Sequence, residues 1–435
     1  MTFACQACSE PQASPGPGTP GDPVAADVVV AWNARILEVA EDEDGFLTLK
    51  GVRSAALMHL AMHDALMSLE PRFRSFSSFD SNLPADPVVS ASEAAYGVAV
   101  VQYPDRAGLF DEERGRWVAE STSDSALDAN ARIVGAEAAA AVLALRANDT
   151  WDTSPSYDWH PMGPGVYAEF NEHSGTPEGF VFGAGWAVAT PFMLDAPSQF
   201  RSPPPPEIQS PEYTRAFDEV KAYGEATSAV RTPDQAHLAM WWKEFVEKSH
   251  NRLARELVDR RGTGLYEAAR LFALLNMSVV DGYVASFDSK FHYNHWRPYT
   301  AIRWASNDGN PDTEEDASWT NLHDHTYAFP SYPSAHGTVC AAAMTVMGEV
   351  FGQQTPFEMT IPEVESAGPG SPLVSMDPPS RAFESFSQAA EECSASRVYL
   401  GIHFRYDSDA GTALGRNVGA MAVREFLVPV GDGER

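Results

Sequence analysis

Residues 334–350 read SAHGTVCAAAMTVMGEV. The stretch begins with serine, a preferred residue at the position before a helix, and continues as an unbroken run of small and apolar residues. A helix that is apolar on all sides is normally buried, and alanine-rich surfaces allow neighbouring helices to approach closely. The stretch therefore predicts a helix of small residues that begins near Ser334.

The rest of the chain has the same character, with apolar residues at helical spacing. Further helices are expected at 24–40, 52–69, 91–102, 126–145, 211–223, 232–249, 253–283, 382–392 and 396–426. Two stretches rich in proline, glycine and serine, 151–210 and 355–380, predict long irregular loops. We predict an all-α protein built around two antiparallel helical bundles.

The predicted organisation is a flexible tether at 1–23, a single large helical domain at 24–426 and a C-terminal tail at 427–435. Within the domain we expect an N-terminal bundle at about 24–150, an irregular connection at about 151–210 and a C-terminal bundle at about 211–426. The C-terminal bundle carries the sequence blocks described below, so we expect the functional site there.

The chain is strongly acidic, with 60 Asp and Glu against 30 Lys and Arg, a net charge of −30. Such a field repels nucleic acids and anionic membrane surfaces, which excludes both as expected partners. We find no clean apolar stretch long enough to predict a membrane span. Any strongly cationic site must therefore be local.

The N-terminal residues lack the apolar core of a signal peptide and resemble a flexible tether. Such tethers often follow a removed signal or a lipidated cysteine, so we expect an extracytoplasmic location, with Cys5 as the candidate anchor. Cys340 and Cys393 lie near the blocks described next. Either a disulfide or two buried thiols would fit them.

The first block is Lys290-Phe-His-Tyr-Asn-His-Trp-Arg297-Pro298. Lys290 and Arg297 are two helical turns apart, so on a helix they would share one face. Pro298 disfavours helical geometry in the preceding residue and is expected to end the helix there. Paired cations in an acidic chain indicate an oxyanion ligand, although two solvated cations would give the same pattern.

The second block is Phe329-Pro-Ser-Tyr-Pro-Ser334-Ala335-His336-Gly337. A helix that begins after Ser334 would present free N–H groups and the positive end of its dipole to an anion. The Ser334 hydroxyl and the Ala335 N–H could donate to an oxyanion, and His336 could act as a general acid or base. The alternative is a capped helix with an exposed histidine.

The third block is Ser396-Arg397-Val-Tyr-Leu-Gly401-Ile-His403-Phe-Arg-Tyr-Asp407. His403 and Asp407 are four residues apart, which predicts that they share one helical face. A carboxylate beside an imidazole fixes its tautomer, as a nucleophilic or metal-ligating histidine requires. Arg397 adds a third cation. A surface His–Asp pair is the alternative.

In this order, the three blocks resemble the motif KxxxxxxRP, PSGH and SRxxxxxHxxxD of the superfamily of type 2 phosphatidic acid phosphatases and vanadium-dependent haloperoxidases. Segments such as LMHLAMHDAL (57–66) and AFPSYPSAH (328–336) look like its soluble bacterial haloperoxidase-type branch. The resemblance covers most of the chain, from about Val24 to Phe426. One departure is Ala335, which stands where the motif has glycine but keeps the N–H.

The resemblance implies a site for vanadate, with phosphate as the competing ligand. The oxyanion-binding residues would be Lys290, Arg297, Ser334, Ala335 and Arg397. His403 would be the axial vanadium ligand, or the nucleophile that attacks phosphorus. Asp407 would orient His403, and His336 would be the acid–base residue.

Phe329, His292 and His295 are candidates to line the pocket. Phe329 stands where bromide-selective relatives tend to carry a histidine, so it looks more like the chloride-oxidising pattern. His59, His63 and Asp64 have metal-ligand spacing, but the same segment looks like a plain helix in the resembling branch. We therefore expect these three residues to serve in packing.

The leading hypothesis is a vanadate-dependent haloperoxidase that oxidises a halide with hydrogen peroxide. The first alternative is an acid phosphatase that hydrolyses a small phosphoester through a phosphohistidine at His403. The second alternative is a catalytically silent oxyanion-binding protein of the cell envelope. Expected partners are the small reactants alone, with no nucleic acid and no membrane span, and homodimerisation stays open.

Overall fold

The computed structural model describes residues 23–121, 124–168, 173–177 and 179–431. The tether expected at 1–23, with Cys5, lies outside these residues apart from Pro23. The α-helices of the described part are α1 (Pro23–Asp44), α2 (Leu49–Leu69), α3 (Pro87–Gln102), α4 (Ala107–Glu120), α5 (Ser125–Leu145), α6 (Pro211–Tyr223), α7 (Pro233–Trp241), α8 (Val246–Arg261), α9 (Leu265–Tyr293), α10 (Pro298–Arg303), α11 (Ala335–Phe351), α12 (Phe386–Tyr399) and α13 (Arg405–Glu425).

Helix starts follow from local chemistry in the sequence. Asp86, Ser210 and Ser334 cap α3, α6 and α11 by accepting a hydrogen bond from a backbone N–H of the first turn. Thr232 and Gln235 form a reciprocal capping box at the start of α7. These caps explain why the predicted starts near 211, 232 and 334 agree with the structure.

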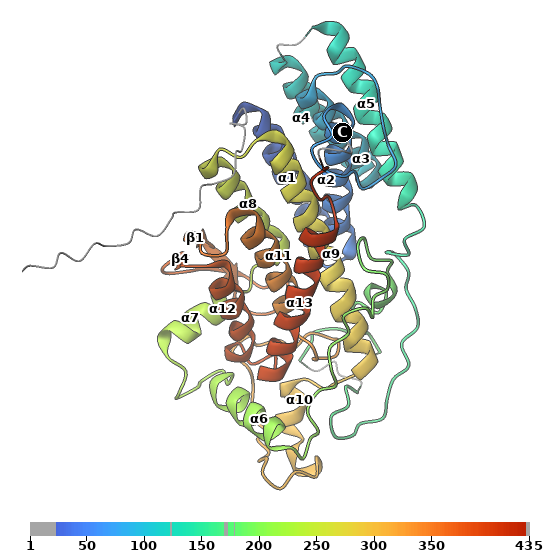
Figure 1. Ribbon diagram of the computed structural model, residues 1–435. Helices are drawn as coiled ribbons and strands as arrows, with labels where there is room; N and C mark the ends of the chain where they lie inside the picture. Colours follow the sequence, from blue (N-terminus) through green and yellow to red (C-terminus); the bar gives the residue numbers. More distant parts are fainter. Residues whose placement is uncertain (1–22, 122–123, 169–172, 178, 432–435) are drawn as a thin grey trace, which may run out of the picture.

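The helices form two packed groups joined by α9. In the first group, α2 packs against α1, α3 and α5; in the second, α11 packs against α12 and α13. The long helix α9 contacts both α2 and α11, and Figure 1 shows α3–α5 at one end of the molecule with α6 and α10 at the other. A single hydrophobic core runs through both groups. The predicted all-α helical-bundle fold is confirmed.

The helix predicted from the opening stretch, α11, lies in the core against α13. At Gly415 on α13, an added Cβ atom would lie 2.0 Å from the carbonyl oxygen of Thr338 on α11. Only glycine permits this approach of the two backbones. The contact sets the position of the N-terminal end of α11, where the second block lies.

The long connection after α5 is irregular, as expected, but it is held tightly. Asp281, fully buried on α9, accepts hydrogen bonds from the backbone N–H groups of residues 192–194 at 2.6–3.1 Å. The strand-like segment at 165–167 also pairs with residues 294–296, just before Arg297. The connection therefore lies against the end of α9 that carries the first block.

Four details differ from the predictions. The helix expected at 232–249 is interrupted, because α7 ends at Trp241 and α8 begins at Val246. The loop expected at 355–380 contains short antiparallel pairs, β1 (Phe357–Thr360) with β4 (Ser380–Phe383) and β2 (Glu363–Glu365) with β3 (Leu373–Ser375). The helix expected at 396–426 is wrong, because the chain leaves α12 at Tyr399 and re-enters a helix only at Arg405. The helix expected to end at 283 continues to Tyr293 as part of α9.

Three further expectations can be compared with the described residues. Cys340 and Cys393 are both buried as free thiols. Residues 428–430 of the expected tail pair with residues 72–74 after α2. In the described part, α9 alone is long and apolar enough to cross a membrane, with a mean hydropathy of 1.2, but 94% of that window is buried as core.

Candidate functional site

Three cationic side chains from different elements meet in the interior. Lys290 lies in the last turn of α9, Arg297 in the extended residue before α10, and Arg397 in the last turn of α12. They are at most 3% exposed, and within the described residues none of them forms a salt bridge. A buried cation without a carboxylate partner is costly, so this cluster favours an anionic ligand.

The seven-residue spacing of Lys290 and Arg297 suggested that they share one helix face, but in the structure they do not. The helix ends at Tyr293, and Asn294 adopts a left-handed conformation with φ of 50°. Arg297 therefore leaves the helix axis and approaches Lys290 from the following segment. Pro298 begins α10 rather than ending α9.

The ring of Phe329 packs against both of these cations. The Lys290 Nζ atom lies 5.2 Å from the ring centre, and the Arg297 Cζ atom lies 4.6 Å from it. Arg297 Nε also donates to the Phe329 carbonyl at 2.9 Å. These contacts do not use every N–H donor of the cluster. Within the described residues, Arg297 Nη2 and Arg397 Nε are buried without a hydrogen-bond partner. The cluster is held in place while part of its donor capacity stays open.

His403 lies in the turn between α12 and α13, not on a continuous helix. Gly401 opens this turn with φ of +83°, and a Cβ atom there would lie 2.4 Å from the Gly224 carbonyl oxygen. Asp407, in the first turn of α13, reaches back to accept a hydrogen bond from the Phe404 N–H at 3.1 Å. The tight turn, rather than helical spacing, brings His403 and Asp407 together.

His403 and Asp407 form a hydrogen bond of 2.9 Å between Nδ1 and Oδ2. Burial, then Arg297, lowers the pKa of His403 well below its usual value, so its ring is neutral. Burial raises the pKa of Asp407 to about 6, while a hydrogen bond from Ser331 opposes that rise. At neutral pH an ionised Asp407 therefore accepts a hydrogen bond from the Nδ1–H group of His403, which leaves Nε2 unprotonated. That nitrogen accepts a hydrogen bond from Arg297 Nη1 at 3.2 Å, so a ligand of His403 Nε2 would take the place of this bond.

His336 and Arg397 are aligned by one backbone carbonyl. The chain leaves α7 at Trp242, and its carbonyl accepts from Arg397 Nη1 at 3.1 Å and from the His336 ring. Among the residues that the structure describes, the His336 Nε2 atom has no hydrogen-bond partner. Burial, then Arg397, lowers the pKa of His336 well below its usual value, so Nε2 is unprotonated at neutral pH.

The N-terminal end of α11 completes this cluster. The Ser334 hydroxyl accepts from the Gly337 N–H at 3.2 Å, and the Ser334 N–H donates to the Asp407 carbonyl at 2.9 Å. These bonds tie the starts of α11 and α13 together. Ala335 is 8% exposed and lines the cavity described next. The helix end thus adds its positive dipole to the three cations.

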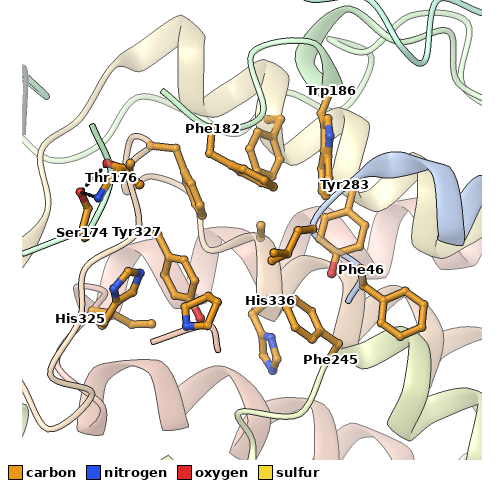
Figure 2. Close-up of a pocket in the computed structure, with 18 of the residues that line it drawn as sticks. Phe46, Ser174, Thr176, Phe182, Trp186, Phe245, Tyr283, His325, Tyr327 and His336 are labelled. Carbon is orange, nitrogen blue, oxygen red and sulfur yellow. Dashed lines mark hydrogen bonds between the residues drawn. The ribbon is translucent and has the colours of Figure 1, made fainter. Parts of the chain in front are cut away.

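The cluster opens into a cavity of about 370 Å³. Its lining includes Ala335, His336, Arg397 and His403 from the predicted set, together with Phe329. Figure 2 shows the aromatic rings of Phe182, Trp186 and Tyr283 on one side of this space and His336 on the other side. Of the three cations, Arg397 lines this cavity, whereas Lys290 and Arg297 are not among its lining residues. The cavity therefore joins one cationic side chain and two histidines near it to aromatic walls.

The donor set fits an oxyanion such as vanadate or phosphate. The unpartnered Arg297 Nη2 and Arg397 Nε atoms can donate to its oxygens, and Lys290 lies beside them. The unprotonated His403 Nε2 can act as a ligand or a nucleophile. Vanadate would then be held by these four residues together with the start of α11.

The structure separates the other candidate histidines from this cavity. His292 is exposed at the end of α9, and His295 is buried with its Nε2 atom 2.7 Å from the Tyr406 hydroxyl. Neither lines the cavity. His59 and His63 are fully buried and bonded to Asn33 and to the Arg74 carbonyl. They serve in packing, and the described residues contain no metal-ligand cluster of three or more.

Sequence reasoning missed three kinds of group that help to form the site. Ser331 lies inside the second block, and its hydroxyl donates to Asp407 at 2.5 Å. Its place between two prolines was a usable signal. Trp242 acts through its carbonyl, which no side-chain pattern reveals. The aromatic wall residues had no motif, because Phe46 and Phe245 lie far from each other and from the three blocks.

Comparisons with known proteins show which proteins this chain resembles. A family model described as the VCPO second helical-bundle domain matches residues 270–430. The vanadium chloroperoxidase of Curvularia inaequalis is 27% identical over 197 residues, which cover 37% of this chain and 29% of that protein. The aligned part thus spans less than a third of that relative.

Solved structures share the fold over most of the chain. The first bacterial vanadium-dependent iodoperoxidase superposes with a TM-score of 0.73 at 21% identity, over 94% of this chain and 98% of that one. A holo-type bacterial vanadium-dependent chloroperoxidase gives a TM-score of 0.66 at 16% identity, over 85% and 90% of the two chains. At these identities the likeness concerns the fold.

The family model and the curated relative support the vanadium haloperoxidase superfamily for the part of the chain that they match. The solved structures extend the likeness in helical-bundle fold over most of the chain. Its matched segment, residues 270–430, contains the three sequence blocks and all the residues of the cation cluster.

Proposed function

We propose that the protein is a vanadate-dependent haloperoxidase, which oxidises a halide with hydrogen peroxide. The observation that carries the proposal is the set of three buried cations without a carboxylate partner, next to the unprotonated Nε2 atom of His403. The matches to vanadium haloperoxidases support vanadate as the native anion in preference to phosphate.

Each residue of the site has a role in this proposal. Lys290, Arg297 and Arg397 bind and neutralise the oxygens of the anion, with help from the start of α11. His403 Nε2 is its ligand, and Asp407 keeps the proton on Nδ1. Bound vanadate supplies a Lewis acid that activates hydrogen peroxide toward a halide.

The remaining residues handle protons and water. His336 lines the cavity, and its buried, unprotonated Nε2 atom has the capacity to accept a proton from a bound reactant and return it. The apolar walls exclude water, which strengthens the interactions of the cations with their ligand.

The proposal is tested on purified protein freed of bound oxyanion. We expect orthovanadate to confer halogenation of monochlorodimedone in the presence of hydrogen peroxide and a halide. Chloride, bromide and iodide are compared, because Phe329 predicts the chloride-oxidising pattern. Hydrolysis of p-nitrophenyl phosphate without vanadate is measured in parallel.

A matched pair of variants locates the site. His403→Ala should abolish halogenation and weaken vanadate binding in calorimetry, whereas His292→Ala, at an exposed histidine outside the cavity, should match the parent protein. Phosphatase activity that vanadate inhibits, without halogenation, would instead indicate an acid phosphatase. Phosphate binding without either activity would indicate a silent oxyanion-binding protein. Full halogenation by His403→Ala would refute the site itself.

A further inference from the structure

Glu247 is a buried carboxyl that the proposed site does not use. It lies in the first turn of α8, and its side chain is 1% exposed. In the part of the chain that the structure describes, neither of its carboxyl oxygens has a hydrogen-bond partner of normal geometry. A buried carboxylate without a partner is costly, and buried ionisable groups of this kind gather at functional sites.

The segment around Glu247 forms one end of the cavity wall. Phe245, two residues before it, lines the cavity and packs against Phe46 with the ring centres 6.1 Å apart. Phe46 follows the end of α1 at Asp44, a half-buried residue whose carboxyl lies near enough to Glu247 to raise its pKa. The ends of α1 and α8 thus bring two carboxyls together beside the cavity wall.

Tyr283 connects Glu247 with the cavity. It comes from α9 and lines the cavity. Burial, then the carboxyl of Glu247, raises the pKa of Tyr283 well above its usual value, and the Tyr283 hydroxyl in turn favours the ionised form of Glu247. Figure 2 shows this hydroxyl directed towards the side where Phe46 and Phe245 lie. The hydroxyl therefore lies between the buried carboxyl and the cavity.

The surroundings of Glu247 keep its proton exchangeable near neutral pH. Burial raises the pKa of Glu247 to about 7, while Tyr283 opposes the rise and Asp44 adds to it. The helix α8 packs against α1, α9 and α11. Asp44 and Tyr283 belong to the first two, whereas Cys340 on α11 contacts His250 instead. At neutral pH Glu247 can therefore both hold a proton and release it.

The proposed reaction consumes a proton that must come from solvent. A halide ion, a hydrogen peroxide molecule and a proton give a hypohalous acid and a water molecule. The halide is oxidised by an electron pair, the O–O bond of the peroxide takes that pair and breaks, and the leaving oxygen takes the proton and departs as water. His336 is unprotonated at neutral pH, so it can return only a proton that it has first taken from a reactant. The additional proton needs a second group.

We propose that Glu247 supplies this proton to the cavity through the hydroxyl of Tyr283 and regains a proton from solvent by way of Asp44. The inference rests on the proposed function, which consumes the proton. In the step, the Glu247 carboxyl gives its proton to the Tyr283 oxygen while the Tyr283 hydroxyl releases its own proton to an acceptor in the cavity. Tyr283 stays neutral, and Glu247 is left ionised until Asp44 passes it the next proton.

Protonation is tested first, on the full chain without vanadate, so that the result does not depend on turnover. Glu247→Gln removes the titratable group and keeps the shape of the side chain. Between pH 6 and 9, the infrared spectrum of the parent minus that of the variant should contain a protonated-carboxyl band that disappears as the pH rises through about 7. Glu256→Gln, at an exposed glutamate of the same helix, is the control and should give no such band. Absence of the band for Glu247 at pH 6 would overturn the proposal, because the residue would have no proton to give.

Turnover with saturating vanadate, peroxide and bromide then tests the delivery of the proton. We expect kcat of the parent to fall as the pH rises through about 7. Glu247→Gln should lower kcat at pH 6 by at least about tenfold and remove that fall, while KM for both reactants and the vanadate affinity stay those of the parent. Glu256→Gln should match the parent throughout. A parent-like kcat and pH profile in Glu247→Gln would overturn the proposal.

Tyr283→Phe removes the hydroxyl alone and keeps the ring in the wall. It should lower kcat as much as Glu247→Gln does, and the double variant should be no slower than either single variant, because both residues serve one path. Losses that multiply in the double variant would overturn the shared path.

Halide oxidation by the parent protein separates the two proposals. If the parent oxidises iodide, bromide or chloride but Glu247→Gln is unaltered, this inference alone fails. If the parent oxidises none of the three halides, the proposed function fails, and the proton delivery proposed here fails with it.

Discussion

Ser331 controls the ionisation of the site through one hydrogen bond. Its hydroxyl donates to Asp407 and so lowers the pKa of that carboxyl, which burial has raised to about 6. Ser331→Ala should therefore raise the pKa further, by about one unit, since a bond to a charged group contributes about 1.5–3 kcal/mol. A protonated Asp407 no longer holds the His403 tautomer. In a plot of vanadate affinity against pH, the decrease on the acid side should therefore occur at a pH higher by that amount.

The buried Ser408 provides the matched control for this prediction, because its hydroxyl has no hydrogen-bond partner. Ser408→Ala should leave this decrease at the same pH as in the parent protein. Vanadate titrations from pH 5 to 8 would measure both variants. A decrease at the same pH as in the parent for Ser331→Ala would show that another group controls the profile.

Lys290 separates stability from binding at a single residue. Its side chain is fully buried, burial lowers its pKa well below its usual value, and its Nζ donates to the Pro330 and Ser331 carbonyls at 3.0 and 2.6 Å. Without an oxyanion, Lys290→Met should change the free energy of unfolding by less than about 1 kcal/mol, because removal of a buried charge offsets the loss of these two hydrogen bonds. The same variant should weaken vanadate binding at least tenfold.

Urea unfolding and calorimetry would separate these two effects. Lys248→Met, which removes a lysine from the surface, should change stability by less than about 1 kcal/mol and leave vanadate affinity unaltered. A loss of stability in Lys290→Met comparable to its loss of affinity would contradict the prediction, because it would indicate a purely structural lysine.

At the scale of elements, the turn between α12 and α13 places the histidine ligand. Gly401 has φ of +83°, and an added Cβ atom would lie 2.4 Å from the Gly224 carbonyl oxygen. Gly401→Ala should destabilise the fold by more than about 2 kcal/mol and abolish vanadate binding, because the turn must shift. Gly115→Ala, on α4 with no atom near its Cβ, should instead stabilise the protein by about 0.5–1 kcal/mol. Equal melting temperatures for the two variants would refute this view of the turn.

Across the whole molecule, buried histidines make the fold sensitive to acid. Burial lowers the pKa of His59, His250 and His295 to about 3, so they stay neutral when folded, while the unfolded chain takes up protons below about pH 6.5. Each such residue therefore contributes stability that is present above pH 6.5 and is lost as the pH falls, at about 1.4 kcal/mol per unit.

Buried carboxyls act in the opposite sense. Burial raises the pKa of Asp281 and Asp407 to about 6 and that of Glu247 to about 7, and it also raises the pKa of Asp64, so the folded state takes up protons there. The histidines with lowered pKa outnumber them; besides the three above they are His63, His323, His325, His336 and His403. Urea unfolding should therefore give a lower free energy at pH 5 than at pH 7. In His295→Gln that fall should be about 2 kcal/mol smaller. Equal free energies of unfolding at pH 5 and pH 7 would show that proton uptake by the buried carboxyls offsets the effect of the histidines.

Much of the fold could be predicted because helices depend on residues three and four positions apart. The apolar spacing at 52–69, the Ser334 cap and the small-residue run of α11 all led to observed helices. The helix expected through 396–426 was wrong for the same reason. Its local pattern is helical, and only the contact of Gly401 with Gly224 shows why the chain turns there.

The sequence by itself determined the helical class, the N-terminal cap of α11 and the identity of the three blocks, since each rests on neighbouring residues. The tertiary structure decided how Lys290, Arg297 and Arg397 converge, which carbonyl aligns His336, and which rings line the cavity. These features join segments far apart in the chain. Their geometry follows from helix packing and tight turns, which local spacing does not encode.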